Sequence, residues 1–268
     1  MTQRKCIFVT GGASGIGRAI ALKFASEGWF VGLGDVDEGG MKETAALIGN
    51  GFTYNHTFDV RDRAAWDDAL GACSTAGGGR IDVLANNAGI PLGGSLDENT
   101  PDEIEHCLDI NLKGAIFGAQ AVLPYLKKTA PGSCLLNTAS AAGIYGTSGA
   151  SVYSATKFGV RALTESLDAE WAEYGIEVRS LMPGFIDTPL IDMPPNQGSN
   201  EQIRQRVKDA GLEITPVAEV GEAAWKAVQG NNLHTKVGKT ARRAAFAARW
   251  MPGRMRKMAR SSSRPLGR

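Results

Sequence analysis

Apolar and polar positions alternate along the chain with two different periods. Short runs rich in Val, Ile, Leu and Phe are each followed by longer stretches in which apolar residues recur every three to four positions. Strands that alternate with helices at this spacing favour a parallel sheet covered by helices on both faces. The pattern therefore predicts a doubly wound α/β fold of three layers. We expect strands over 5–10, 29–33, 53–58, 81–85, 133–138 and 176–182, and helices over 14–27, 38–48, 62–76, 101–129, 151–174, 200–211 and 218–229.

Length and composition fit one large globular domain. The chain has 268 residues, of which 43% are hydrophobic and 21% are charged. No apolar run approaches the ~20 residues that a membrane-spanning helix needs, and the short apolar stretch near the start is too brief for a signal peptide. The four cysteines and three histidines are scattered. We therefore expect a cytoplasmic protein without a disulfide scaffold and without a metal site.

The net charge of +1 conceals an acidic body and a basic tail. Residues 1–235 carry a net charge of −10, whereas residues 236–268 carry +11 and contain no acidic residue. Phe246 and Trp250 accompany the arginines of this tail. We expect helices that pack on the acidic body or on a neighbouring subunit; contact with a membrane surface and a solvated tail are the alternatives. Nucleic-acid binding has no support beyond the charge.

A glycine-rich turn follows the first predicted strand. It runs from Thr10 to Gly17 and leads into a predicted helix. In Rossmann-type sheets such a turn lets the backbone approach a pyrophosphate, which the N-terminus of the following helix attracts. The spacing here is G-x-x-x-G-x-G rather than G-x-G-x-x-G. From this motif alone, the segment could be either a phosphate-binding site or an ordinary glycine-rich turn.

Asp35 strengthens the case for a dinucleotide. It ends the second apolar run and lies 18 residues after Gly17, close to the position of the carboxylate that binds an adenosine ribose. A carboxylate there repels a 2′-phosphate, so we expect NAD(H) to be preferred, although NADP(H) is not excluded. Asp37 is a rival for this position, and Arg18 could partly compensate a 2′-phosphate.

A second group of residues carries acid/base chemistry. Tyr153 and Lys157 lie four residues apart at the start of a predicted helix, so both project from one face. An ammonium close to a phenol stabilises the phenolate and makes the tyrosine a usable general acid or base. Ser140 follows a predicted strand at the edge of the sheet where a substrate would lie. A Tyr-x-x-x-Lys pair alone is common on solvated helices.

Several separated motifs occur in an order that resembles the short-chain dehydrogenase/reductase family of single-domain NAD(P)-dependent oxidoreductases. The resemblance covers about residues 4–190. After it, the segment Leu233–Lys239 departs from the glycine-rich ending of many relatives. What the family implies about the wall on the substrate side is therefore not transferred to this chain. The motifs that carry the resemblance are Thr10–Gly17, Asp59, Asn86–Gly89, Asn111, Ser140, Tyr153–Lys157 and Pro183–Thr188.

The resemblance implies roles for individual residues. Tyr153 is the implied general acid/base, Lys157 lowers its pKa and holds the nicotinamide ribose, and Ser140 orients the substrate oxygen. Asn111 is implied to anchor a water that passes the proton to solvent. The implied cofactor contacts are Gly11, Ser14, Gly15, Ile16, Gly17, Asp35, Asp59, Val60, Asn87, Ala88, Gly89, Tyr153, Lys157, Pro183, Gly184, Ile186 and Thr188.

These observations predict an NAD-dependent oxidoreductase that acts on a secondary alcohol or ketone with apolar character. The alternatives are an NADPH-dependent carbonyl or 3-oxoacyl-thioester reductase, and a catalytically idle nucleotide-sensing or scaffold protein. We expect residues 1–235 to form the dinucleotide-binding catalytic domain, with a substrate loop near 190–212. The resemblance also suggests a homodimer or homotetramer that uses the helices of 101–129 and 151–174.

Overall fold

A central sheet of parallel strands organises the molecule, whose computed structural model describes residues 4–49 and 51–261. The strand order is β3-β2-β1-β4-β5-β6-β9. Successive strands therefore run outward from β1 in one direction and then, from β4 onward, in the other. This order confirms the doubly wound fold. The strands are β1 (Cys6–Thr10), β2 (Phe30–Asp35), β3 (Thr53–Thr57), β4 (Val83–Asn86), β5 (Cys134–Thr138), β6 (Glu177–Pro183) and β9 (His234–Val237).

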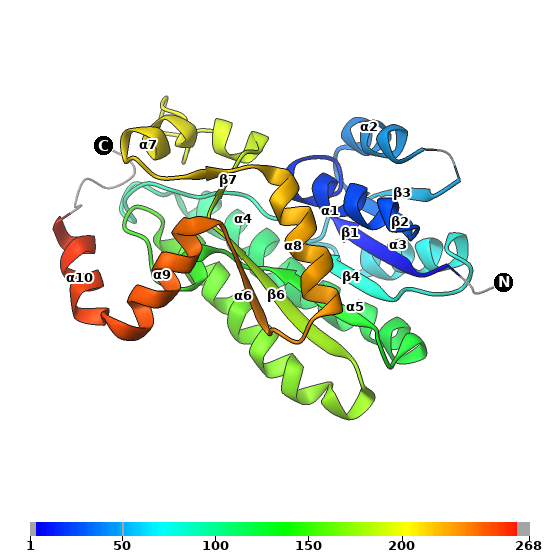
Figure 1. The fold of residues 1–268 in the computed structure, drawn as a ribbon. Helices are drawn as coiled ribbons and strands as arrows, with labels where there is room; N and C mark the ends of the chain where they lie inside the picture. Colours follow the sequence, from blue (N-terminus) through cyan, green and yellow to red (C-terminus); the bar gives the residue numbers. More distant parts are fainter. Residues whose placement is uncertain (1–3, 50, 262–268) are drawn as a thin grey trace.

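Helices cover both faces of this sheet (Figure 1). Alternate residues of β1 show why both faces must be covered: Ile7 and Val9 pack into one apolar cluster, and Cys6 and Phe8 into the other. The first cluster includes residues of α1 (Gly15–Ser26), α2 (Glu38–Ile48) and α8 (Val217–Gln229). The second includes residues of α3 (Arg63–Ala76), α5 (Gly114–Thr129) and α6 (Ser151–Glu170).

The segment 101–129, where helices were expected, has three parts. It consists of α4 (Pro101–Leu108), a π-helical turn over Asp109–Lys113, and α5. A capping box between Thr100 and Glu103 fixes the start of α4. The π-helical turn carries Asn111, whose side chain is hydrogen-bonded to the backbone of Ile90. One extra residue in a helical turn leaves no mark in the apolar periodicity, so the sequence did not predict it.

The segment after β6 contains more regular structure than the loop expected over 183–199. Within the expected loop lie β7 (Phe185–Ile186), which pairs with β8 (Ile214–Thr215) in a two-stranded sheet, and a 3₁₀ turn over Pro189–Asp192. The helix expected over 200–211 is present as α7 (Ile203–Asp209). Arg204 forms ion pairs with Asp187 and Asp192, which fasten α7 to this segment.

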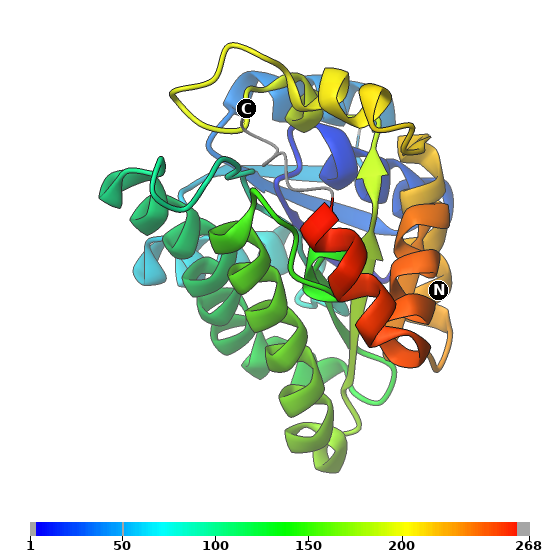
Figure 2. The ribbon, with the colours of Figure 1, turned by 90° about the vertical axis from the view of Figure 1, so that its left-hand side faces the viewer.

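Two helices follow the last strand. The strand β9 spans residue 235, where the sequence places the end of the catalytic domain, and α9 (Gly238–Trp250) starts directly after it. Then comes α10 (Pro252–Ser261), which packs beside α9 (Figure 2). Residues 262–268 of the expected basic tail lie outside the described residues. Within the described part of the chain, no helix is both long and apolar enough to span a bilayer.

Candidate functional site

A cleft of about 1480 Å³ opens at the carboxyl ends of the parallel strands. It includes the point where the strand order reverses between β1 and β4, the usual ligand position in open α/β sheets. All the implied catalytic and cofactor-contact residues line this cleft except two, Gly17 and Asn111. Residues that are distant in sequence are thus brought to one site.

The glycine-rich turn forms one end of the cleft. Gly11 and Gly15 adopt positive φ angles of 68° and 52°, which glycine tolerates best. A Cβ on Gly17 would lie 1.9 Å from the carbonyl oxygen of Gly11, so no other residue fits there. Because α1 begins at Gly15, the unpaired N–H groups of its first turn lie beside the turn backbone. This cradle, with no side chain filling it, fits a pyrophosphate.

The far side of the turn is fastened to the end of β4. The hydroxyl of Thr10 accepts hydrogen bonds from the backbone N–H groups of Asn87 and Ala88, both at 3.0 Å. In return, the side-chain amide of Asn87 donates to the carbonyl of Thr10 at 3.0 Å. The Asn87–Gly89 segment is therefore a fixed wall beside the glycine turn.

Asp35 lies at the carboxyl end of β2 and lines the cleft. Its two oxygens accept hydrogen bonds from the backbone N–H groups of Ala13, at 3.0 Å, and Asp37, at 3.1 Å. The rival Asp37 instead caps α2 by accepting from the N–H of Gly40 at 3.0 Å, and it is not among the residues that line the cleft. Of these two carboxylates, Asp35 is the one that lines the cleft.

Arg18 is occupied by neighbouring groups. Its Nε and Nη2 atoms donate to the carbonyl of Ala13, the carbonyl of Gly40 and the hydroxyl of Thr44, and Nη2 pairs with Glu43 at 2.9 Å. Arg18 does not line the cleft. A phosphate in the cleft would have to compete with these acceptors for the Arg18 guanidinium.

Asp59 and Val60 form the wall next to Asp35. Hydrogen bonds from Arg61, at 2.6 to 3.0 Å, lower the pKa of the Asp59 carboxyl, which is therefore ionised. The carbonyl of Val60 accepts from the indole N–H of Trp66 at 2.9 Å, which fixes the turn after β3. Both residues remain in contact with the cleft.

Ser140, Tyr153 and Lys157 meet at the other end of the cleft. Tyr153 and Lys157 lie one turn apart near the start of α6, and Ser140 follows β5. The ammonium of Lys157 donates to the carbonyl of Thr138 at 3.0 Å and lies 5.7 Å from the centre of the Tyr153 ring. A Cβ on Gly89 would come within 3.4 Å of the same ammonium, so this glycine leaves Lys157 open to the cleft.

Burial dominates the electrostatics of this group. It raises the pKa of Tyr153 to about 12, against a hydrogen bond from Ser140 that lowers it. It lowers the pKa of Lys157 to about 8. The Lys157 ammonium is hydrogen-bonded to the Thr138 carbonyl, and that Lys157 lowers the pKa of Tyr153, as the resemblance implies, stays a prediction.

Asn111 lies behind the cleft wall. Its amide oxygen accepts from the N–H of Ile90 at 2.8 Å, and its amide nitrogen donates to the Ile90 carbonyl at 2.9 Å and approaches the hydroxyl of Thr156 at 3.4 Å. The side chain is 1% exposed. Cys107, one turn earlier, is a buried neighbour that sequence reasoning missed; burial raises the pKa of its thiol to about 11.

The substrate side of the cleft is mostly apolar. Ile191 and Leu212 of the expected substrate loop line it, whereas Met193 does not and is 49% exposed. Leu92 and residues of the C-terminal helices, such as Met255 of α10, complete the wall. These residues were missed because no motif marks them.

The family model for short chain dehydrogenases matches residues 5–197. The chain belongs to this family. As a short-chain dehydrogenase it is an oxidoreductase that binds NAD(P)(H), in agreement with the fold and the glycine cradle.

Relatives of this short-chain dehydrogenase include enzymes with different substrates. The 3-alpha-(or 20-beta)-hydroxysteroid dehydrogenase of Mycobacterium tuberculosis is 39% identical over 191 residues, 71% of this chain and 72% of the relative. The crystal structure of levodione reductase has a TM-score of 0.81 and 28% identity, and covers 90% of this chain and 98% of its own. The structure of a short-chain dehydrogenase from Burkholderia phymatum in complex with NAD has a TM-score of 0.83 and 25% identity. The match covers 96% of this chain and 97% of that one.

Proposed function

We propose that this protein is an NAD-dependent oxidoreductase that interconverts a secondary alcohol and a ketone on an apolar substrate. One observation carries the proposal: a single cleft holds a glycine cradle and Asp35 at one end and Ser140, Tyr153 and Lys157 at the other. When bound, the nicotinamide cofactor would supply or accept the hydride.

Residues along the cleft would hold the cofactor in an extended form. The glycine turn would bind the pyrophosphate, Asp35 the adenosine ribose, and Lys157 the nicotinamide ribose. The remaining contacts are grouped around these three. They are Asp59 and Val60 at the adenine, Asn87, Ala88 and Gly89 along the adenosine half, and Pro183, Gly184, Ile186 and Thr188 beside the nicotinamide.

Charge supports NAD(H) over NADP(H). The Asp35 carboxylate would accept hydrogen bonds from ribose hydroxyls and repel a 2′-phosphate. Arg18, the nearby cation that could offset this repulsion, is engaged with Glu43 and backbone carbonyls.

Tyr153 would move the proton. Its hydroxyl would donate to the carbonyl oxygen during reduction and accept the proton during oxidation, while Ser140 would orient that oxygen. The Lys157 ammonium, one turn away, would favour the phenolate. Asn111, which is fixed to the backbone of Ile90, would anchor the water that passes the proton to solvent.

The lining of the cleft supports an apolar substrate. Leu92, Ile191, Leu212 and Met255 present hydrocarbon or thioether surface on the side away from the glycine turn. The M. tuberculosis relative is named for its action on hydroxysteroids. Substrates of this class combine a secondary alcohol or ketone with a large apolar body, which such a wall would bind.

Replacing Tyr153 by Phe tests the acid/base assignment. Because only the hydroxyl is lost, kcat is expected to fall by ~10²-fold or more while the Kd for NADH stays unchanged. Tyr145→Phe, which removes a hydroxyl elsewhere in the same cleft, is the matched control and is expected to keep kcat near the wild-type value. Loss of NADH binding together with activity in Tyr153→Phe would contradict the assignment.

Exposed apolar residues support a homodimer or homotetramer. Leu108, Ile116 and Phe158, from α4, α5 and α6, are each more than one third exposed. These helices are the proposed contact surfaces, and burial of these side chains against a second copy would remove them from water. Light scattering of the purified protein, with Ile116→Glu and Phe158→Glu as variants, is expected to show a multimer that both substitutions weaken.

A further inference from the structure

The helix α9 has two chemically distinct faces. Its inner face consists of alanines, and Ala241 is fully buried against the body of the protein. Its outer face carries Phe246 and Trp250, which are 59% and 66% exposed. Two large aromatic side chains one turn apart are thus presented to solvent by a helix that is already anchored on its opposite face.

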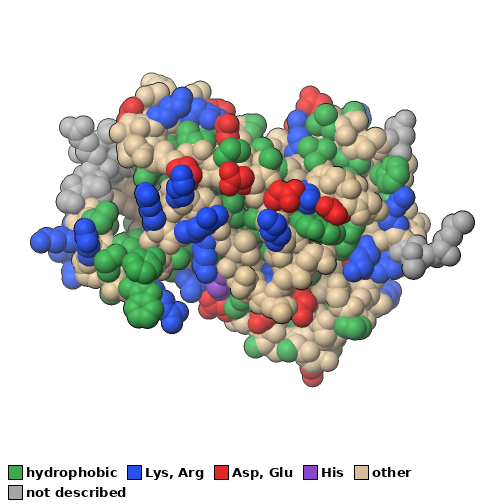
Figure 3. Space-filling view, in the orientation of Figure 1, with side chains coloured by type: hydrophobic (Ala, Val, Ile, Leu, Met, Phe, Trp, Pro, Cys, Tyr) green, Lys and Arg blue, Asp and Glu red, His purple; other side chains and the backbone are tan. Residues whose placement is uncertain are grey.

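Cations surround these aromatic residues. At about 100° per residue, Arg242 and Arg249 lie on one side of Phe246, and Arg243 lies on the other side beyond Trp250. Figure 3 shows the corresponding patch at the left, with hydrophobic surface bordered by basic side chains. The outer face of α9 is therefore an aromatic strip with a basic rim.

Most basic side chains of α9 and α10 form no ion pair with the part of the chain that the structure describes. Residues 238–261 contain eight Lys and Arg residues and no Asp or Glu. Among the described residues, the one ion pair made by these helices is between Lys239 and Glu213, at 3.6 Å. The acidic body thus does not neutralise the helices that pack on it. A second copy of the same face would bring like charges together.

We propose that the outer face of α9, together with the basic residues of α10, docks on the surface of an anionic lipid bilayer. Trp and Phe favour the boundary between headgroups and acyl chains, where the polar edge of the indole stays hydrated. Arginine side chains reach outward from such a helix to anionic headgroups. The patch combines both requirements on one rigid helix.

Docking at this face would place the bilayer on the outer side of α9 and α10. The same two helices line the cleft through Thr240 and Ala244 of α9 and Met255 of α10. An apolar substrate held in the bilayer would then lie close to the wall of the cleft. This last step rests on the proposed function, whereas the docking itself does not.

The direct test is binding of the whole protein to vesicles of phosphatidylglycerol and of phosphatidylcholine. Co-sedimentation is expected with the anionic vesicles and not with the zwitterionic ones, and ~1 M salt is expected to release the protein. Binding to neither vesicle type, or equal binding to both, would overturn the proposal.

Brominated lipids locate the contact, because bromine quenches tryptophan fluorescence at short range. Trp29, Trp66 and Trp171 are almost fully buried and Trp225 is partly buried, so Trp250 is the most exposed of the five tryptophans and serves as the reporter. Quenching is expected in the wild-type protein and is expected to be lost in Trp250→Phe, which keeps an aromatic ring for binding. Unchanged quenching in Trp250→Phe would show that another surface meets the lipid.

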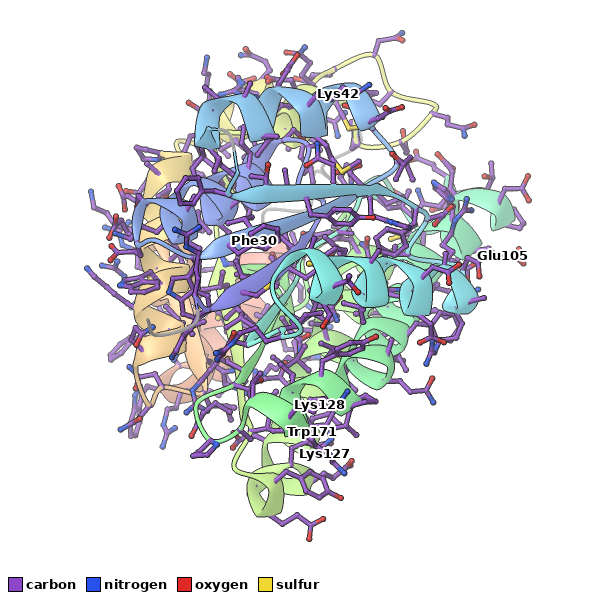
Figure 4. All side chains as sticks on the ribbon, turned by 90° about the vertical axis from the view of Figure 1, so that its right-hand side faces the viewer. Phe30, Lys42, Glu105, Lys127, Lys128 and Trp171 are labelled. Atoms are coloured by element: carbon purple, nitrogen blue, oxygen red, sulfur yellow. The ribbon has the colours of Figure 1, made fainter. Side chains whose placement is uncertain are left out.

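Paired substitutions separate the two components of the face. Phe246→Ala/Trp250→Ala and Arg242→Ala/Arg249→Ala are each expected to weaken vesicle binding at least tenfold. Lys127→Ala/Lys128→Ala removes the same charge from the opposite side of the molecule, labelled in Figure 4, and is expected to leave binding unchanged. Weakening by all three pairs would indicate nonspecific attraction and overturn the proposal.

Three further readouts distinguish loss of the lipid contact from misfolding and from loss of a contact between copies of the chain. Circular dichroism and turnover of a water-soluble ketone check that the variants fold; loss of vesicle binding with both intact is expected. If Phe246→Ala/Trp250→Ala lowers the molar mass in light scattering and leaves vesicle binding intact, the face is an interface between copies and the proposal is wrong.

Discussion

Replacing Asp35 by Asn isolates the charge on which the expected cofactor preference depends. The carboxylate is partly buried at the end of β2 and accepts hydrogen bonds from the N–H groups of Ala13 and Asp37. Asn keeps one acceptor oxygen, which can retain the bond to the buried Ala13. The substitution therefore removes the negative charge with little change in the backbone around it.

The size of the effect follows from these contacts. A hydrogen bond to a charged acceptor contributes about 1 kcal/mol more than one to a neutral acceptor, so the loss over two ribose hydroxyls is about 2 kcal/mol. This corresponds to a roughly 30-fold weaker Kd for NADH. Removing repulsion between the carboxylate and a 2′-phosphate strengthens NADPH binding by ~1 kcal/mol or more. Together, these two effects should lower the preference for NADH over NADPH by about 100-fold or more.

The assay is fluorescence titration of NADH and NADPH on wild-type protein and variants, with urea unfolding to confirm the fold. The free energy of unfolding is expected to change by about 1 kcal/mol or less in Asp35→Asn. Asp37→Ser is the matched control, because it removes a neighbouring charge and keeps a residue that can cap α2. An unchanged ratio of the two Kd values in a folded Asp35→Asn protein would refute the reasoning, and a shift in Asp37→Ser instead would identify the rival carboxylate.

Three other substitutions test separate parts of the site. Gly17→Ala would place a Cβ 1.9 Å from the Gly11 carbonyl, so NADH binding measured by titration is expected to be lost; wild-type affinity would contradict the cradle. Because the pKa of Lys157 is about 8 in the folded protein and 10.5 in a free chain, the unfolded chain binds more protons between these values. Folded-state stability should therefore rise with pH across that window by up to about 3 kcal/mol, a rise that urea titrations should not find in Lys157→Met. Ser140→Ala removes the hydrogen bond that lowers the pKa of Tyr153, so the pH profile of kcat/KM for alcohol oxidation is expected to shift upward, and an unshifted profile would exclude that contact.

The main parts of the fold could be predicted because they depend on local patterns. Buried parallel strands require apolar runs, and amphipathic helices between them leave a clear period, so β1 to β6 and most helices were predicted close to their observed bounds. The four-residue strand β9 was not predicted, because His234 to Val237 contains only one large apolar residue and its pattern is typical of a loop. Its place at the sheet edge is set by pairing with β6.

The candidate site was predictable where the chemistry requires a particular residue type. Glycine at positions 11, 15 and 17 and the Tyr153–Lys157 pair carry such requirements. All of them except Gly17, which lies against the Gly11 carbonyl, line one cleft. The contribution of Met255 was not predictable, because it depends on how α10 packs across the cleft rather than on any local spacing. The burial that raises the Tyr153 pKa and the hydrogen bond from Lys157 to the Thr138 carbonyl also depend on tertiary packing, which the sequence does not show.

One measurement tests the central claim most directly: NADH and NADPH binding, followed on the same sample by turnover of a panel of secondary alcohols and ketones. The panel runs from small aliphatic compounds to aryl and steroid-sized ones. The account predicts tighter binding of NADH than of NADPH, with turnover of bulky apolar members that Tyr153→Phe abolishes. Tight NADH binding with no turnover of any member would contradict the proposed oxidoreductase activity on this substrate class and favour a nucleotide-sensing role.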